Sequence, residues 1–547
     1  MQLTDPTLLR NQTLIEGLWT QADDGGTFPV TDPATGATIG QVPAMGAAET
    51  RRAIAAADRA WPAWRALTAA QRAAILRRWH DLMLAAQDDL AQIMTAEQGK
   101  PLAEARGEIA YAASYFEWFA EEGRRAYGEL IPPHQADRRL LVMRQPVGVC
   151  AAITPWNFPA AMIARKAAAA LAAGCTLVVK PAEETPLSAL ALAVLGERAG
   201  LPAGVFNLVT GVPAAIGAEL TANPTVRKLS FTDSTEVGRL LMLQCADTVK
   251  RLSLELDGNA PFIVFDDTDL EGAVAGAIES KFRNSGQTCV CANRLLVQSG
   301  IHDAFVERLV EQVAGLKVGA GVETGVVQGP LINAAALAKV EAQIADAVAG
   351  GARILTGGRR HTLGGIFFEP TVMVGVQPGM RVAREETFGP LAPICRFHTE
   401  AEAIALANAT EFGLAAYFYT RDLGRAFRVA EALEYGMVGL NTGLISTAVA
   451  SFGGIKLGDR CPQHRHTGRA YVGQCHGPTV LMRVTGAASL QNRVYSNAQL
   501  RCWLSMLLLT WSEKGVAYHA EAAGRGPGCT TRSDAKAVHI RCGRCYG

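Results

Sequence analysis

Residues 147–180, VGVCAAITPWNFPAAMIARKAAAALAAGCTLVVK, decide the fold class of this chain. A short apolar strand (147–154) is followed by an amphipathic helical stretch (159–173) and by a second apolar strand, TLVVK (176–180). Parallel neighbouring strands need a long crossover, which is usually a helix. The segment therefore predicts a βαβ unit.

The same alternation continues beyond this unit. Three more apolar strands are expected, at 205–210, 228–232 and 251–256. Helical stretches separate them, at 187–199, 213–222 and 235–247. Such alternation predicts an α/β fold with a mostly parallel sheet covered on both faces, and ligands bind these sheets at the carboxyl ends of the strands. A second α/β region is expected from 258 to about 441, and helices follow a short strand-rich entry before residue 130, with Thr68 and Gln71 forming a capping box.

The composition is that of a large folded protein. A chain of 547 residues suits two to four domains of about 100–200 residues each. Its 49% hydrophobic and 19% charged residues exclude disorder, and its net charge of +1 points to no polyanionic partner. No secretory signal or membrane-spanning stretch is expected, and the cysteine usage predicts a reduced, cytoplasmic setting.

The end of the chain has a different character. Residues 457–547 carry twelve Lys and Arg against four Asp and Glu, whereas residues 1–456 carry 40 against 47. The basic segment contains no known nucleic-acid module, and Cys542 with Cys545 forms a single Cys-x-x-Cys pair. We therefore expect neither nucleic acid nor metal binding, and we predict that this divergent tail is poorly ordered.

Three segments contain residues suited to chemistry: ITPWNFP (153–159), LELDGNAP (254–261) and NSGQTCVCANR (284–294). The thiol of Cys289 suits a covalent nucleophile, the carboxylate of Glu255 a general base, and the amide of Asn157 an oxyanion donor. Each signal is weak alone, because a single Cys is usually a small core residue and a Glu near a strand end is usually solvated.

Taken together, these segments resemble the aldehyde dehydrogenase superfamily, most closely its succinate-semialdehyde dehydrogenase branch. The resemblance runs from about Leu8 to Lys456 and includes PWNFP, KPAEETP (180–186), EETFGPLAP (385–393) and FGGIK (452–456) in family order. It implies a Rossmann-type parallel-sheet cofactor domain (1–125 and 145–257), an α/β catalytic thiol domain (258–445) and an oligomerisation region that includes 126–144. A homo-oligomer is expected of the family.

The resemblance also implies a reaction, the oxidation of succinate semialdehyde to succinate with NAD or NADP. Cys289 attacks the aldehyde carbon, and Asn157 holds the resulting oxyanion. Hydride transfer then leaves a thioester, which water activated by Glu255 hydrolyses.

Further residues take roles from the same resemblance. The dinucleotide would be held by residues at strand ends and turns: Ile153, Thr154, Pro155, Trp156, Lys180, Glu183, Ser234, Glu386 and Phe388. Glu183 favours NAD, since a carboxylate repels a 2′-phosphate. The substrate carboxylate would be bound by Arg165, Arg283 and Ser446. Cys291 has two readings, a partner of Cys289 in a local disulfide or a packed thiol.

Three departures from the family pattern support an alternative, a catalytically impaired or dead homologue. Asp233 stands where a glycine is expected, at the start of the helix that should meet the cofactor pyrophosphate. Asp257 also replaces a glycine; we expect it to strain a turn and to raise the pKa of Glu255 by like charge. The family ending is missing after Lys456, which puts the homo-oligomer in doubt.

Overall fold

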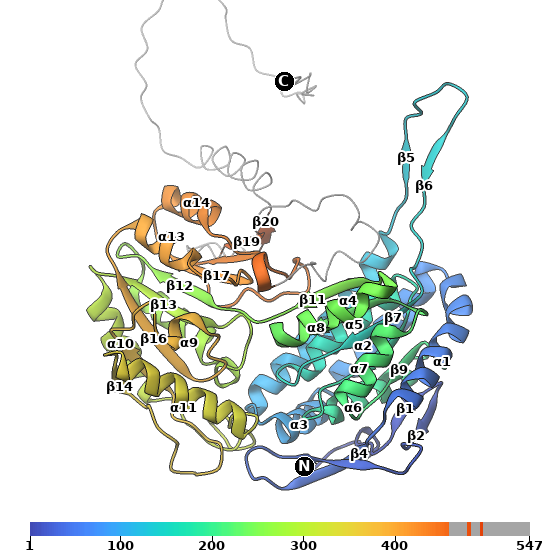
Figure 1. Ribbon diagram of the computed structural model, residues 1–547, viewed down its shortest axis with the longest axis horizontal. Coiled ribbons are helices and arrows are strands. Elements are labelled where there is room, and N and C mark those ends of the chain that lie inside the picture. The colour runs from blue at the N-terminus through green and yellow to red at the C-terminus, as the bar shows by residue number, and fades with distance from the viewer. Residues whose placement is uncertain (459–478, 483–492, 496–547) are drawn as a thin grey trace, which may run out of the picture. The chain divides into compact units, whose positions relative to one another are not determined.

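The computed structural model describes residues 1–458, 479–482 and 493–495 of the 547-residue chain. It has the α/β fold expected from the sequence, with two main sheets and helices packed around them (Figure 1). The expectation that the tail is poorly ordered concerns residues that lie largely outside this description.

The first main sheet contains five parallel strands in the order β11-β10-β7-β8-β9. They are β7 (Val149–Ile153), β8 (Thr176–Lys180), β9 (Phe206–Leu208), β10 (Val226–Thr232) and β11 (Arg251–Glu255). The connecting helices are α5 (Pro159–Ala172), α6 (Pro186–Arg198), α7 (Pro213–Ala222) and α8 (Thr235–Cys245). All five expected strands and all four expected helices are confirmed. The register pairs Ile153 with Lys180 and Thr232 with Glu255, so the carboxyl ends of these strands form one edge.

The N-terminal helices pack beside this sheet (Figure 1). They are α1 (Ala47–Ala66), α2 (Ala69–Ala85), α3 (Gln87–Gln98) and α4 (Leu102–Arg124). The capping box is confirmed, since the Thr68 hydroxyl accepts from Gln71 N–H and the Gln71 side chain accepts from Thr68 N–H. Two antiparallel ribbons form the entry, β1 (Thr13–Ile15) with β2 (Leu18–Thr20) and β3 (Thr27–Thr31) with β4 (Thr38–Pro43).

The second main sheet contains nine strands among the described residues, in the order β14-β15-β16-β13-β12-β17-β18-β19-β20. The strands before the tail are β12 (Ala260–Val264), β13 (Ala292–Gln298), β14 (Arg353–Thr356), β15 (Thr371–Val374), β16 (Leu391–Phe397), β17 (Ala415–Tyr419) and β18 (Met437–Leu440). Its helices are α9 (Leu270–Lys281), α10 (His302–Ala314), α11 (Ala334–Ala349), α12 (Arg381–Arg384), α13 (Glu400–Asn408) and α14 (Leu423–Ala432). Within the tail, β19 (Thr479–Met482) pairs parallel with β18, and β20 (Arg493–Tyr495) pairs antiparallel with β19.

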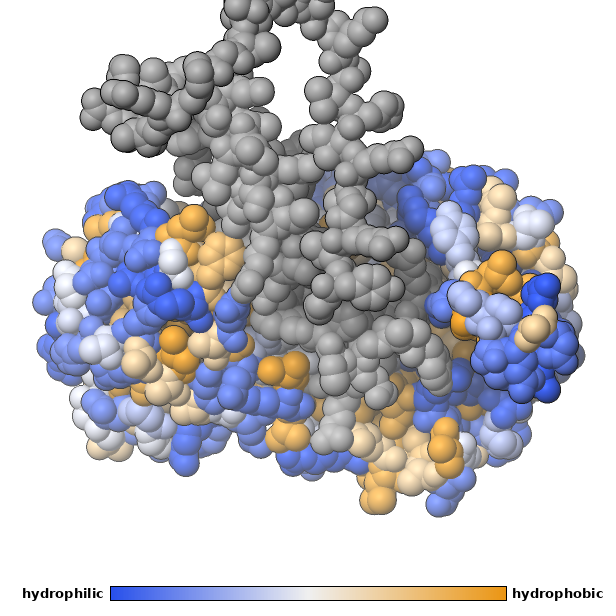
Figure 2. All heavy atoms as spheres, turned by 90° about the horizontal axis from the view of Figure 1, so that it is seen from above, coloured by the Kyte–Doolittle hydropathy of each residue, from blue (hydrophilic) through white to orange (hydrophobic). Residues whose placement is uncertain are grey.

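A separate hairpin formed by β5 (Glu129–Ile131) and β6 (Leu140–Val142) extends away from the five-stranded sheet (Figure 1). Its apolar side chains are exposed, at Leu130, Ile131, Leu141, Val142 and Met143. On the face shown in Figure 2, hydrophobic residues form small groups between hydrophilic ones. The described helices include none that is long and apolar enough to cross a membrane.

Candidate active site

The carboxyl edge of the five-stranded sheet holds the first group of candidate residues. Thr154 follows β7, Lys180 ends β8, and Glu255 ends β11. The Thr154 hydroxyl is buried and has no hydrogen-bond partner in the described part of the chain. Buried polar atoms normally have hydrogen-bond partners, so the Thr154 hydroxyl is available to bond to a ligand at this edge.

Asn157 lies between this edge and the loop that carries Cys289. Its side-chain Nδ2 donates to the carbonyl of Gln287 at 3.1 Å, and its own carbonyl accepts from Asn284 Nδ2 at 3.0 Å. Two segments about 130 residues apart in sequence are thereby joined. The structure thus brings the Asn157 amide next to the thiol loop.

The Cys289 loop is tightly shaped by backbone geometry. Asn284 and Ser285 adopt left-handed conformations, with φ of 51° and 54°. A Cβ on Gly258 would lie 2.3 Å from the Cys289 carbonyl oxygen, so only glycine fits there. The Cys289 residue as a whole is half-buried. Burial, with the Glu255 and Glu386 carboxylates, raises the pKa of the Cys289 thiol well above its usual value, so attack requires a proton acceptor.

Glu255 is fully buried, and neither of its carboxylate oxygens has a hydrogen-bond partner among the described residues. Its Oε2 lies 3.5 Å from Nη1 of Arg165. Burial raises the pKa of Glu255 to about 7, although Arg165 and Lys166 act in the opposite direction. A carboxylate that titrates near neutral pH suits a general base.

Arg165 extends from α5 into a buried aromatic pocket. Its Nε donates to the Tyr115 hydroxyl at 3.0 Å and its Nη2 to the Tyr111 hydroxyl at 2.9 Å, while the Phe452 ring lies 3.9 Å from the guanidinium carbon. Its Nη1 has no hydrogen-bond partner in the described ranges. None of these three aromatic residues was expected at the site, although Phe452 belongs to the FGGIK segment and the two tyrosines have i, i+4 spacing on α4.

The other two candidate substrate residues are less closely tied to this group. Arg283 is half-buried, and its guanidinium lies 5.4 Å from the Phe158 ring, next to Asn157. Its Nε is buried and unpaired within the described part of the molecule. Ser446 is half-buried in the segment after β18, the segment that also carries Phe452.

The remaining candidates surround the same region. Glu386 is buried and its Oε1 accepts from Gly258 N–H at 3.0 Å. The Trp156 and Phe388 rings meet edge to face with centroids 5.5 Å apart. Lys180 Nζ pairs with Glu183 Oε2 at 2.5 Å. The site thus combines a thiol, a base, an amide donor and buried cations.

Comparisons with known proteins identify this arrangement. The sequence model of the Aldehyde dehydrogenase family matches residues 19–469. The chain belongs to the aldehyde dehydrogenase family. It is 66% identical over 456 residues to a glutarate-semialdehyde dehydrogenase of Pseudomonas aeruginosa, a match that covers 83% of this chain and 94% of that protein.

Two further relatives agree with the family assignment. The chain is 65% identical over 456 residues to a succinate-semialdehyde dehydrogenase [NADP(+)] of Escherichia coli, covering 83% of this chain and 95% of that protein. A crystal structure of succinate-semialdehyde dehydrogenase from Burkholderia pseudomallei superposes with a TM-score of 0.85 and 64% identity, over 86% of this chain and 97% of that one. The expected family and enzyme class are confirmed.

Asp257 was expected to strain a turn and to raise the pKa of Glu255, and the structure shows neither effect. It is not among the described residues with positive φ, so it causes no left-handed strain. The groups that shift the pKa of Glu255 do not include it; instead, Asp257 helps to raise the pKa values of Glu386 and Asp233. Its Oδ2 accepts from Thr235 N–H at 2.8 Å, at the start of α8. Asp257 therefore acts on the helix N-terminus rather than on the base.

The residues around α8 test whether an aldehyde dehydrogenase cofactor fits this edge. Ser234 is the N-cap of α8 and accepts from Val237 N–H at 3.5 Å. The Thr235 hydroxyl is buried without a partner in the described ranges, like that of Thr154. These unsatisfied groups fit a polar dinucleotide, but Asp233 sits at the same helix start, where desolvation, with Asp257, raises its pKa to about 6. The unpartnered hydroxyls at the carboxyl edge of the five-stranded sheet thus fit a dinucleotide, whereas the Asp233 carboxylate would repel its phosphates.

Cys291 is a packed thiol in this structure. It is buried, its Sγ donates to the Gly286 carbonyl at 3.3 Å, and Lys281 Nζ lies 3.7 Å from it. Cys289 and Cys291 are both free. The structure therefore agrees with the packed-thiol reading.

Proposed function

We propose that this aldehyde dehydrogenase oxidises succinate semialdehyde to succinate. One observation carries the proposal: Arg165 is buried, and its Nη1 has no hydrogen-bond partner among the described residues, although it lies 3.5 Å from Oε2 of Glu255. A substrate carboxylate would complete the contacts of the guanidinium, and such charge-assisted contacts select for an anionic aldehyde.

In this proposal the residues act in sequence. The Cys289 sulfur bonds to the aldehyde carbon as the thiol proton passes to solvent water, and Asn157 Nδ2 donates to the oxyanion that forms. A dinucleotide held at the carboxyl edge would accept the hydride from this intermediate, which leaves a thioester on Cys289. Glu255 takes a proton from water, which attacks the thioester carbonyl; carbon–sulfur cleavage releases succinate and the thiol.

The carboxylate-binding role can be tested on Arg283, which does not contact Glu255. Arg283→Ala should lower kcat/KM for succinate semialdehyde by roughly ten- to a hundredfold, since a charge-assisted contact is worth about 1.5–3 kcal/mol. The measurement is reduced-cofactor formation, with an uncharged aldehyde as the control substrate. Equal losses for both substrates would mean that Arg283 is structural.

Glutarate semialdehyde is a second candidate substrate, favoured by the relative of that name at 66% identity. It adds one methylene group between the aldehyde and the carboxylate. One methylene changes discrimination by about 1–3 kcal/mol, so the ratio of kcat/KM for the two acids decides between them. The proposal for succinate semialdehyde requires that ratio to exceed one in its favour.

For the cofactor, we propose NAD in preference to NADP. The Glu183 carboxylate is exposed near the carboxyl end of β8, where it would repel a 2′-phosphate. Glu183→Gln should therefore raise kcat/KM for NADP relative to NAD. The relative named as NADP(+)-dependent favours the opposite preference, so the measurement decides between the two cofactors. If the ratio of kcat/KM for NADP to that for NAD does not change in Glu183→Gln, Glu183 does not determine the cofactor preference.

The domain assignment follows the two main sheets. Residues 1–125 and 145–257 would bind the dinucleotide, 258–445 would form the catalytic thiol domain, and 126–144 would belong to the oligomerisation region. The exposed apolar side chains of the β5–β6 hairpin support docking onto a second copy of the chain. The free cysteines in the described residues support a reduced, cytoplasmic setting. No finding supports the catalytically impaired alternative.

A further inference from the structure

A buried ion pair lies beneath Asn157 and has no role in the mechanism described above. Lys100 Nζ lies 2.5 Å from Glu108 Oε2, and both side chains are only 1% exposed. Removing two charges from water is unfavourable unless additional hydrogen bonds satisfy them. The further partners of this pair are therefore informative.

In the described part of the chain, the further hydrogen-bond partners of these two side chains belong to one short segment, residues 157–161. Lys100 Nζ donates to the Asn157 carbonyl at 2.7 Å and lies 4.2 Å from the Phe158 ring centroid. Glu108 Oε1 accepts from Ala160 N–H at 3.0 Å and from Ala161 N–H at 3.1 Å. The lysine thus holds the carbonyl before α5, while the glutamate holds the first-turn amides of that helix.

This segment determines where the Asn157 side chain points. The carbonyl that Lys100 binds also accepts from Asn284 Nδ2, and the Asn157 amide donates to Gln287 in the thiol loop. Rotation of the peptide after Asn157 would break the Lys100 and Asn284 contacts together and turn the amide away from the loop. We propose that Lys100 and Glu108 are positioning residues that align the Asn157 amide with the oxyanion, an inference that rests on the proposed function.

The chain offers a matched control for the helix-capping part of this arrangement. Glu97 is also a buried carboxylate, and it accepts from Leu187 N–H at 2.7 Å and from Ser188 N–H at 2.8 Å, in the first turn of α6. That helix carries none of the proposed site residues. Glu97→Gln therefore reports the cost of changing a buried, helix-capping carboxyl group to an amide at a helix that carries no site residue.

The test compares Lys100→Met with Glu97→Gln. Loss of an oxyanion donor lowers turnover by a factor of up to about 10²–10³. We therefore expect Lys100→Met to lower kcat and the rate of the burst of reduced cofactor by roughly ten- to a hundredfold. Alkylation of Cys289 by iodoacetamide forms no oxyanion and should change less than about twofold. Lys100→Arg, which keeps a donor, should recover part of kcat, and Glu97→Gln should keep all of it.

Other outcomes would overturn specific claims. A Lys100→Met variant with unchanged kcat, or one whose kcat and alkylation rate fall together, contradicts the positioning role. If that variant does not fold, Glu108→Gln takes its place with the same expectation, because it keeps an acceptor for the α5 amides but removes the charge that pairs with Lys100. An inactive wild-type chain, or an Asn157→Ala variant as active as wild type, contradicts the proposed function itself.

Discussion

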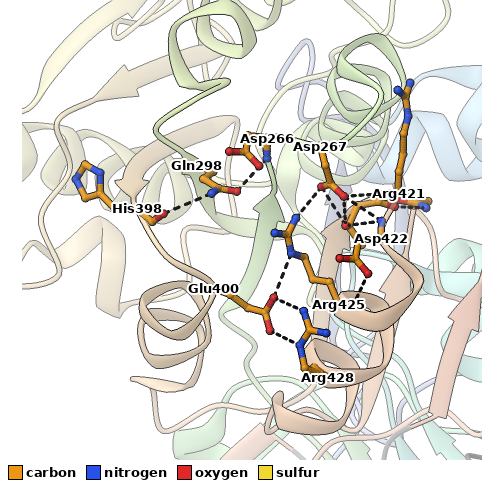
Figure 3. Close-up of polar contacts among 11 residues, drawn as sticks. Asp266, Asp267, Gln298, His398, Glu400, Arg421, Asp422, Arg425 and Arg428 are labelled. Carbon is orange, nitrogen blue, oxygen red and sulfur yellow. Dashed lines mark hydrogen bonds and ion pairs between the residues drawn. The ribbon is translucent and has the colours of Figure 1, made fainter.

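The carboxyl edges of the two main sheets differ in how their polar side chains are satisfied. At the edge of the nine-stranded sheet, Asp267 accepts from Asp422 N–H at 2.9 Å and from Arg425 Nη1 at 2.9 Å. Glu400 binds both Arg425 and Arg428, each at about 3 Å (Figure 3). These groups neutralise one another, and the network joins the ends of β12 and β17 to α13 and α14.

At the carboxyl edge of the five-stranded sheet, by contrast, several buried polar groups lack hydrogen-bond partners in the described part of the chain. The Thr154 and Thr235 hydroxyls and both oxygens of Glu255 are buried without hydrogen-bond partners among the described residues. An unpaired buried polar group costs about 1–3 kcal/mol, so several of them at one sheet edge fit a place where a ligand or a reaction uses them. Strand topology alone does not locate the site, because Cys289 precedes β13 and therefore lies at the amino end of the other sheet.

The largest expected effect is on Glu255. Glu255→Gln should lower steady-state turnover by about 10²–10⁴ while still allowing one burst of reduced cofactor, because the thioester forms but is not hydrolysed. Glu400→Gln, at the satisfied edge, should leave turnover unchanged. Stopped-flow absorbance of the reduced cofactor measures both, and loss of the burst as well would assign Glu255 an earlier role.

The next effect is on stability at the carboxyl edge of the nine-stranded sheet, where the charged groups pair with one another. Asp267→Asn removes the charge shared by Arg425 and the α14 amides and should lower the free energy of unfolding by about 2 kcal/mol, with turnover preserved. Asp266→Asn, one residue earlier and exposed, is the control and should change stability by less than about 0.5 kcal/mol. Urea denaturation checks both; a loss of activity in Asp267→Asn would make the two edges less distinct than we argue.

A smaller effect is expected from Asp257, the carboxylate that caps α8. Asp257→Asn keeps an acceptor for Thr235 N–H but removes a charge near the cofactor phosphates, so the Kd for the dinucleotide should fall by roughly threefold to tenfold, more at low salt. Glu236→Gln, in the exposed first turn of α8, should have a weaker effect. Fluorescence quenching at two salt concentrations measures the Kd. Equal changes in the two variants would show a general charge effect rather than one specific to Asp257.

The smallest expected effect is a shift in pH dependence. Because burial raises the pKa of Glu255 to about 7, the base is increasingly deprotonated as pH rises through 7, and hydrolysis should accelerate over that range. Arg165 lowers this pKa, so Arg165→Met should move the profile to higher pH. Turnover of an uncharged aldehyde across pH 6–9 (roughly the range in which the base titrates) measures the shift, and a profile that moves to lower pH would contradict the assignment.

Local patterns predicted most of the first sheet, because strand and helix periodicity depends on neighbouring residues. The resemblance supplied Cys289, Glu255 and Asn157, which the fold brings to one region. What the sequence could not supply were contacts between distant segments: Lys100 under Asn157, the tyrosines of α4 around Arg165, and the capping role of Asp257. In each case the side-chain partner depends on how the elements pack, which no local pattern encodes.

The contact between Arg165 and Glu255 also limits how the substrate specificity of this enzyme can change during evolution or in the laboratory. A substitution at Arg165 that admits a neutral or longer aldehyde alters, in the same step, the cation beside the base. Arg283 lies on a different segment and has no such link to Glu255. If Arg165 and Arg283 bind the substrate carboxylate as proposed, a change of substrate should cost less activity at Arg283 than at Arg165.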